Sequence, residues 1–151
     1  NMSVVCCVRM SVIDVVLENK PFLDISVRIS PSNLYRNDER LSNFEGIIAE
    51  RLFNIIGKSN TIDYEKLAII PNRFQWVVAI ELVVLNMNTD PTDLCSIAIN
   101  TSLKCPMVPN HTLIRGESGE YEDFDINSFP SEAYLLPILK EIPICISIYK
   151  V

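Results

Sequence analysis

The sequence predicts an α+β fold in which helices pack against a mixed β-sheet. Three observations support this class. Short apolar stretches alternate with period two, as half-buried strands do. Two longer stretches carry apolar residues at helical spacing. The expected order of elements, β-β-β-α-β-β-α-β, mixes strands and helices without strict alternation, which favours α+β over a doubly wound α/β fold.

The expected elements follow from local patterns in chain order. Apolar residues 4–8 and 12–17 indicate two strands, and strict alternation over 23–29 indicates a third. Polar residues predict a loop to about Arg40. Apolar residues between Leu41 and Ile56 then fall on one helical face, with Ser42 and Glu45 as a possible capping box and Gly57 as a natural stop.

The second half of the chain predicts further strands and one helix. Residues 67–70 indicate a short strand, and the nearly continuous apolar stretch 76–85 is typical of a central strand covered on both faces. A helix is expected from Asp90 as N-cap, with Pro91 in its first turn, to Pro106. Its shared face is expected to hold Leu94, Ile97, Ala98, Thr101 and Cys105. An acidic loop over 115–125 and a last strand over 142–151 complete the prediction.

Composition and charge exclude several classes of protein. The 151 residues are 48% hydrophobic and 21% charged, which is typical of one globular domain. The net charge of −6 disfavours a free-standing nucleic-acid-binding surface. Five cysteines in apolar stretches, without a C-x-x-C pair, predict buried, reduced thiols, and with a single histidine they predict no metal site. Without an apolar stretch of membrane length or a signal peptide, we expect no membrane association.

Five segments resemble one family in their order and spacing. They are the strand 74–86, the helix 93–104 with its exit at Val108-Pro109, the stretch 62–71, the opening 1–9 and the strand 142–146. Together they resemble the RNase PH-type subunits of the RNA exosome ring. The resemblance implies an RNase PH-like fold (ribosomal protein S5 domain 2-like). We therefore expect residues 1–151 to form a single RNase PH-type domain that is incomplete at both ends.

One turn departs from the pattern of the family's phosphorolytic members. Those members bind phosphate with a Gly-Gly-Thr-Arg turn, where glycines let the backbone approach and the arginine pairs with the anion. The matching turn here is Asp90-Pro91-Thr92-Asp93, which lacks the glycines and places an acid at the arginine position. The family's basic residues on the first helix are also missing around Glu50 and Phe53. The family's catalytic aspartate would fall after Val151.

These departures imply the supporting, non-catalytic class of ring subunit. The resemblance then implies no catalytic residue, no metal and no cofactor in this chain. Its partners would be other RNase PH-type subunits in a hetero-hexameric ring, cap subunits, and single-stranded RNA in the channel. The implied location is the nucleus, the nucleolus and the cytoplasm. The resemblance fits two of the three supporting subunit types equally well.

Two arginines are the candidate RNA-binding residues. Arg36 and Arg40 lie before the first expected helix, where the family carries basic residues toward the RNA path. Arginines in a loop can equally be solvated without a ligand. Trp76 is expected in the core, and Glu81 is expected at a sheet edge or interface, paired with a base. The alternatives for function are an active phosphorolytic 3′-to-5′ exoribonuclease and an RNA-independent protein-interaction module.

Overall fold

The structure, a computed structural model, describes residues 1–18, 20–30, 38–127 and 129–148. Its main sheet has the strand order β1-β4-β2, with the short β3 also paired to β4. The strands are β1 (Ser3–Asp14), β2 (Leu23–Ile29), β3 (Ala68–Ile70) and β4 (Phe74–Asn86). β1 and β3 run antiparallel to β4 whereas β2 runs parallel to it, so the sheet is mixed. The predicted α+β class is confirmed.

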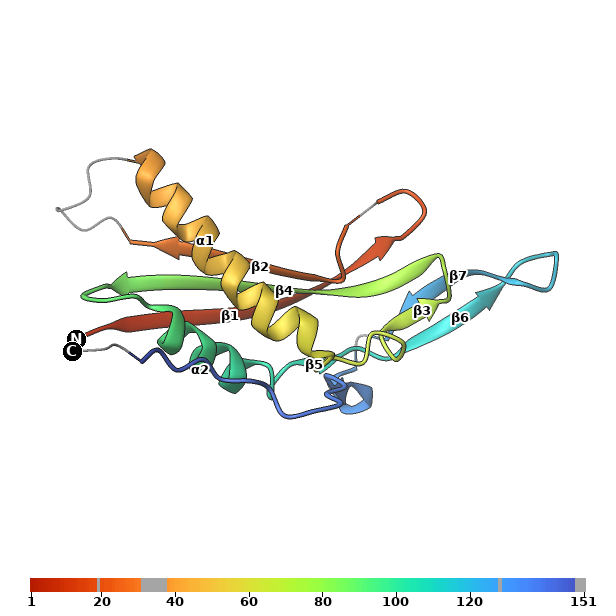
Figure 1. Cartoon of the computed structure of the whole chain (residues 1–151). Coiled ribbons are helices and arrows are strands. Elements are labelled where there is room, and N and C mark those ends of the chain that lie inside the picture. The colour runs from red at the N-terminus through yellow and green to blue at the C-terminus, as the bar shows by residue number, and fades with distance from the viewer. Residues whose placement is uncertain (19, 31–37, 128, 149–151) are drawn as a thin grey trace.

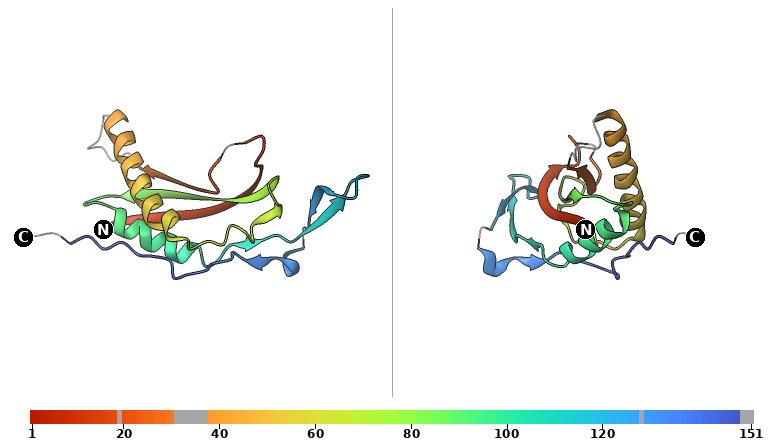
Figure 2. Two further views of the ribbon diagram at one scale, coloured as in Figure 1. Left: turned by 45° about the vertical axis from the view of Figure 1, so that its right-hand side comes forward. Right: turned by 90° about the vertical axis from the view of Figure 1, so that its left-hand side faces the viewer.

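Two helices cover one face of this sheet (Figures 1 and 2). They are α1 (Asp38–Ile56) and α2 (Thr92–Ser102). Because α1 connects β2 to the strands that follow, β2 can lie parallel to β4 with the helix packed over the sheet. The two helices and β4 contribute a set of fully buried side chains. Burying one such apolar side chain stabilises the fold by roughly 1.5–3 kcal/mol relative to leaving it exposed. These side chains are Ile48, Leu52, Ile56, Val78, Ile80, Leu82, Val84, Cys95 and Ile99.

The other face of the sheet is mixed: it buries Ile13 and Val77, but several of its positions are polar and exposed. Cys7 and Arg9 of β1 and Arg28 of β2 point to this side and are exposed. The Arg9 Nη2 atom lies 2.6 Å from Glu81 Oε1 of β4. The predicted pairing of Glu81 with a base is therefore confirmed, but its expected place at a sheet edge is wrong, because β4 is the central strand.

Two local expectations for the first half are corrected by the structure. The predicted strand 4–8 and the first part of the predicted strand 12–17 form one continuous strand, β1, because both pair with β4 in one antiparallel ladder that ends at Asp14, whereas residues 15–17 form a turn. The capping box is wrong, since α1 already begins at Asp38. Glu45 instead accepts a hydrogen bond from the Ile29 N–H (2.6 Å), which ties α1 to the end of β2. The α-helix ends at Ile56, before Gly57, as predicted.

The predicted buried face of α2 is also wrong. Ile97, expected on the shared face, is 46% exposed. The residues that α2 buries are Thr92, Cys95, Ser96 and Ile99. The helix is apolar on more than one side, so the apolar pattern alone did not fix its rotation.

The expected acidic loop is a β-hairpin. β6 (His111–Arg115) pairs with β7 (Tyr121–Ile126) and projects from the body of the fold (Figure 1). Phe124 anchors the hairpin to the main sheet, with its ring centroid 5.1 Å from that of Phe74. Nearby, β5 (Met107–Val108) pairs with β8 (Tyr134–Leu135), and a 3-10 turn spans Pro130–Glu132.

The predicted last strand is not a strand in the part that the structure describes. Residues 142–148 are without regular secondary structure and run alongside α2, while residues 149–151 lie outside the described ranges. The isoleucines of the alternating pattern, Ile144, Ile146 and Ile148, are all at least half exposed. Within the described ranges, no helix has the length and apolar character needed to cross a membrane.

Candidate functional site

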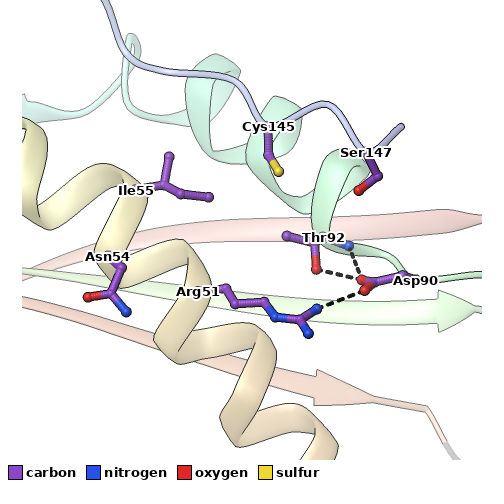
Figure 3. A pocket seen from close by; sticks show the side chains of 7 residues that line it. All are labelled: Arg51, Asn54, Ile55, Asp90, Thr92, Cys145 and Ser147. Atoms are coloured by element: carbon purple, nitrogen blue, oxygen red, sulfur yellow. Dashed lines mark hydrogen bonds and ion pairs between the residues drawn. The ribbon is translucent and has the colours of Figure 1, made fainter. Parts of the chain in front are cut away.

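A cavity of about 360 Å³ lies between the last turns of α1, the start of α2 and the segment 142–148 (Figure 3). It includes the turn Asp90-Pro91-Thr92-Asp93 at the start of α2. The first helix contributes a cation, and the turn before the second helix contributes a carboxylate and a hydroxyl. The lining residues are Arg51, Asn54, Ile55, Asp90, Thr92, Cys145 and Ser147.

Asp90 is the centre of the polar contacts in this cavity. Its Oδ1 atom accepts a hydrogen bond from the Thr92 backbone N–H at 3.0 Å and another from the Thr92 hydroxyl. Its Oδ2 atom lies 2.9 Å from Arg51 Nη1 (Figure 3). The carboxylate thus satisfies a free amide at the helix start and pairs with Arg51, the cation among the described lining residues.

The predicted N-cap shifts by one residue. Pro91 occupies the N-cap position, because its carbonyl accepts the first helical bond, from Cys95 N–H at 2.9 Å. Asp90 still caps the helix through its side chain, as its bond to Thr92 N–H shows. Burial alone would raise the pKa of Asp90, but the hydrogen bonds from Thr92 and the adjacent Arg51 outweigh it and hold that pKa below its ordinary value.

Asp93, the acid at the arginine position of the phosphate-binding turn, is engaged by the chain itself. Its Oδ2 atom accepts a hydrogen bond from Ser147 N–H at 2.7 Å, and its Oδ1 atom accepts one from the Ser147 hydroxyl at 2.9 Å. The backbone bond from Ser147 is the main reason why the pKa of Asp93 is lowered. Asp93 therefore fastens the segment 142–148 to the start of α2.

Two further side chains of α2 hold the same segment. Ser96 Oγ accepts a hydrogen bond from Cys145 N–H at 2.9 Å, and Asn100 Nδ2 donates to the Ile142 carbonyl at 2.7 Å. Positions 93, 96 and 100 lie on one side of a helix. One face of α2 thus binds the backbone of an extended segment and closes one wall of the cavity. Burial, reinforced by Asp93, raises the pKa of the Cys145 thiol in this wall.

Arg51 is the functional residue that the sequence reasoning missed. The loss of basic residues was inferred at Glu50 and Phe53, and neither of these lines the cavity. Arg51, between them, does reach the turn before α2. The sequence signal is a basic residue near the end of the first helix together with an acidic turn before the second, but only the tertiary structure brings Arg51 and Asp90 together.

The two predicted RNA-binding arginines are not brought into the cavity. Arg36 lies outside the described residues. Arg40 is exposed in the first turns of α1. A rise of 1.5 Å per residue places it about 16 Å along the helix axis from Arg51, on a similar side of the helix. Within the described ranges, no group of three or more His, Cys, Asp or Glu side chains is arranged to hold a metal ion.

Known proteins resemble this chain in sequence and in fold. No family model matches the sequence. Over 95 residues, 62% of this chain, it is 26% identical to a candidate exosome complex exonuclease, RRP42, from Dictyostelium discoideum. A chain of an archaeal exosome core superposes on 91% of this chain with a TM-score of 0.52 and 20% identity. A chain of the Archaeoglobus fulgidus exosome with RNA bound to the active site does so over 91% with a TM-score of 0.58 and 19% identity.

These likenesses establish the fold. The arrangement of sheet and helices is that of chains of the exosome core, as the sequence resemblance implied. The present chain spans 28% of the length of the Dictyostelium relative and 46% and 49% of the two archaeal exosome chains.

Proposed function

We propose that this chain is part of a non-catalytic RNase PH-type subunit of an exosome ring that supports 3′-to-5′ RNA degradation. The fold and the likeness to RRP42 support the ring. The observation that carries the non-catalytic assignment is the engagement of Asp90. Its carboxylate binds the Thr92 N–H and Arg51, the groups at this turn that would otherwise attract a phosphate.

Electrostatics oppose phosphate at this turn. Two unit charges 4 Å apart interact with about 1 kcal/mol in bulk water and about 4 kcal/mol near a protein surface. Asp90 and Asp93 would each repel an incoming anion, and Pro91 has no N–H to donate to it. Arg51 cannot compensate while it is paired with Asp90.

An active phosphorolytic exoribonuclease is the second candidate, because Arg51 supplies one cation at the turn and the Dictyostelium relative is named as an exonuclease. The purified chain, alone and after reconstitution with RNase PH-type subunits, would be incubated with labelled single-stranded RNA, magnesium and phosphate. We expect no nucleoside diphosphate above the level of an Arg51→Ala variant. Phosphate-dependent release that Arg51→Ala abolishes would assign the enzyme instead.

Assembly tests the ring itself. We expect the chain to enter a hetero-hexamer when it is co-expressed with other RNase PH-type subunits, as measured by native mass spectrometry. A chain that stays outside every such complex while remaining folded would contradict the proposal and favour the RNA-independent interaction module. Residence in the nucleus, nucleolus and cytoplasm is part of the same proposal, and imaging of a tagged protein checks it.

Within the ring, Arg36 and Arg40 are proposed to contact RNA phosphates. The chain's net charge of −6 gives no attraction for RNA by itself. Replacing both arginines with alanine should weaken RNA binding by the ring equally for all sequences and reduce the salt slope by about one to two units. Arg28→Ala on the exposed sheet face is the matched control. Unchanged affinity in an intact double-mutant ring would leave both as solvated residues.

A further inference from the structure

The strand β1 has a hydrogen-bonded neighbour on one side only. It lies at the end of the strand order β1-β4-β2 and pairs with β4 along its whole length. Just beyond the strand, the Val15 N–H donates to the Arg73 carbonyl at 2.7 Å. Backbone groups alternate in direction along a strand, so the odd-numbered residues of β1 bond to β4, and the even-numbered residues point their N–H and C=O groups away from it. We call these even-numbered residues the free edge, which comprises Val4, Cys6, Val8, Met10 and Val12.

The free edge has few of the features that normally keep another strand from adding. Among the described residues, no hydrogen bond from backbone atoms outside the sheet reaches it. β1 is 12 residues long, contains no proline, and has Arg9 as its only charged side chain before Asp14, whereas short length, proline and charge are the usual protections of an edge strand. The opposite edge of the sheet differs, because the Ile29 N–H of β2 already donates to Glu45 of α1. Of these two edges, β1 is therefore the one open to a further strand.

The free edge is complementary to a second copy of itself. Two β1 strands that pair antiparallel about a twofold axis at Val8 would place Val8 opposite Val8 of the second copy. Cys6 would then face Met10, and Val4 would face Val12. All the free-edge residues form hydrogen-bonded pairs in this register, which gives about ten N–H···O bonds between the two copies. A register displaced in either direction would leave some of these residues without a partner.

The charges and the position of α2 agree with this register. Arg9 faces Cys7 of the second copy, whereas an axis one residue nearer the C-terminus would set Arg9 against Arg9, and like charges directly opposite each other are unfavourable. The guanidinium of Arg9 can keep its partner Glu81, 2.6 Å away in the same chain. α2 packs along the N-terminal half of β1 (Figures 1 and 2). The twofold axis therefore puts the two copies of α2 at opposite ends of the paired strands, where they do not collide.

We infer that the free edge of β1 is the interface of a homodimer, in which β1 of a second copy extends the main sheet. The strand itself identifies the occupant, because its own sequence pairs every free-edge residue and separates the two arginines. The pairing also brings Met10 and Val12, which are only partly buried, beside the half of the second copy that α2 covers. Removing these apolar groups from water adds to the backbone bonds. The inference does not depend on the proposed ring function.

Disulfide trapping tests the register. In the dimer, the exposed Cys7 faces position 9 of the second copy as a pair without mutual hydrogen bonds, whose Cα atoms lie about 4.5 Å apart, and this separation suits a disulfide. The full chain with Arg9→Cys, oxidised with glutathione disulfide, should form a covalent dimer in which mass spectrometry finds position 7 linked to position 9. Adding Cys7→Ser should abolish this dimer. Arg28→Cys, at an exposed position of β2, is the matched control and should give at most about a tenth as much dimer.

Sedimentation equilibrium measures the dimer without a cross-link. The background Ile146→Lys with Ile148→Lys removes an exposed apolar stripe that could associate by itself. In this background, Val8→Pro deletes an N–H of the free edge and leaves the bonds to β4, so it should raise the dimer dissociation constant at least about tenfold. Val8→Ala keeps that N–H and should change the constant by less than about threefold. Circular dichroism checks the folding of the proline variant, and the trapping result decides if that variant does not fold.

Several results would overturn the inference. One is a chain that stays monomeric at every concentration measured. Another is equal weakening by Val8→Ala and Val8→Pro, which would assign the association to side-chain packing instead of the strand edge. Equal yields of covalent dimer from Arg9→Cys and Arg28→Cys would reduce the trapping to random collision. A wild-type covalent dimer linked from Cys7 to Cys7 would show a different register and would overturn the twofold axis at Val8.

Discussion

Asp90 links helix capping to the loss of an anion site. The same carboxylate accepts from the Thr92 N–H and pairs with Arg51, whose side chain comes from another element. A residue that stabilises a helix start by offering a negative charge also occupies the place where an external anion would bind. At this turn, the carboxylate that stabilises the helix start therefore excludes the binding of a phosphate.

Replacing Asp90 with alanine should lower the free energy of unfolding by about 0.5–2 kcal/mol, the range for a lost helix cap. Asp90→Asn should cost less, because its amide oxygen can still accept from Thr92 N–H. Urea denaturation at neutral pH measures both. Asp24→Asn, at an exposed position of β2, is the control and should stay within about 0.5 kcal/mol of the wild type. A larger loss in the asparagine variant than in the alanine variant would contradict the capping role.

The lowered pKa of Asp90 also gives a pH dependence. Because its folded-state pKa lies below its unfolded value, the ionised carboxylate contributes stability that is present above about pH 4. That contribution is lost as the pH falls through the folded-state pKa. The free energy of unfolding of the wild type should therefore fall more steeply below about pH 4 than that of Asp90→Asn. Parallel curves for the two proteins in urea titrations across this range would rule the contribution out.

Single residues were predictable where the signal was local. Trp76 heads an apolar stretch, and its place in the core is confirmed at 5% exposure. Asp90 precedes a proline and a helical pattern, so its capping role could be predicted to within one position. The role of Arg51 could not be predicted, because its partner Asp90 lies far away in the sequence. Only the packing of α1 against α2 brings the two side chains together.

At the scale of elements, α2 combines two functions on different sides. Cys95 and Ile99 pack into the core, whereas Asp93, Ser96 and Asn100 bind the backbone of the segment 142–148. The alternating pattern of that segment predicted a strand. Alternation reports which side chains face water, but a strand also needs a neighbouring backbone, which the described part of the chain does not provide.

Ser96→Ala should release the segment 142–148 from α2. Ser96 is fully buried, so the lost hydrogen bond should cost about 1 kcal/mol, and the amide of Cys145 should exchange its hydrogen faster. Hydrogen–deuterium exchange followed by mass spectrometry measures this. Thr101→Ala is the control, since Thr101 is exposed on the same helix and bonds only to the Ile97 carbonyl within it. Equal protection of the segment in both variants would show that α2 does not hold it.

Leu52 tests the packing of α1 on the sheet. It has no exposed surface, and Leu52→Ala should lower the free energy of unfolding by about 2–5 kcal/mol through lost burial and a residual cavity. Ile47→Ala, at a position 46% exposed on the same helix, should cost well under half as much. Thermal or urea unfolding decides between them. Comparable losses at both positions would mean that the buried face of α1 is assigned incorrectly.

At the scale of the molecule, the helices of the described residues cover one face of the main sheet, and much apolar surface is exposed elsewhere. Ile144, Ile146 and Ile148 are 50%, 78% and 92% exposed. We expect the chain alone to self-associate, because such a stripe is unfavourable in water. Light scattering should report oligomers or aggregates that Ile146→Lys with Ile148→Lys reduces. Ile47→Lys on α1 is the control. A wild-type chain that stays monomeric at high concentration would contradict this expectation.

The overall class was predictable because it depends on repeated patterns, but the peripheral parts were not. In the core, β2 and α1 carry a clear period in the sequence, and β4 is marked by a nearly continuous apolar stretch. The β6–β7 hairpin carries neither signal, since its exposed strand β7 alternates acids with only a few apolar residues, such as Phe124. It packs on the core through Leu113 and Phe124, whose ring lies against Phe74, and contacts between distant residues leave no periodic signal.

The central position of β4 also bears on how the chain is synthesised. β1 and β2 are synthesised first, but each pairs with β4 and not with the other. Val4 and Ile29, for example, both pair with Val84, which is synthesised much later. On the ribosome, both early strands leave the exit tunnel without their partner and keep unpaired edges until α1 and β4 have followed. Non-local pairing of this kind slows folding to milliseconds or longer. Nascent chains stalled before residue 86 should therefore be the species that most need chaperones.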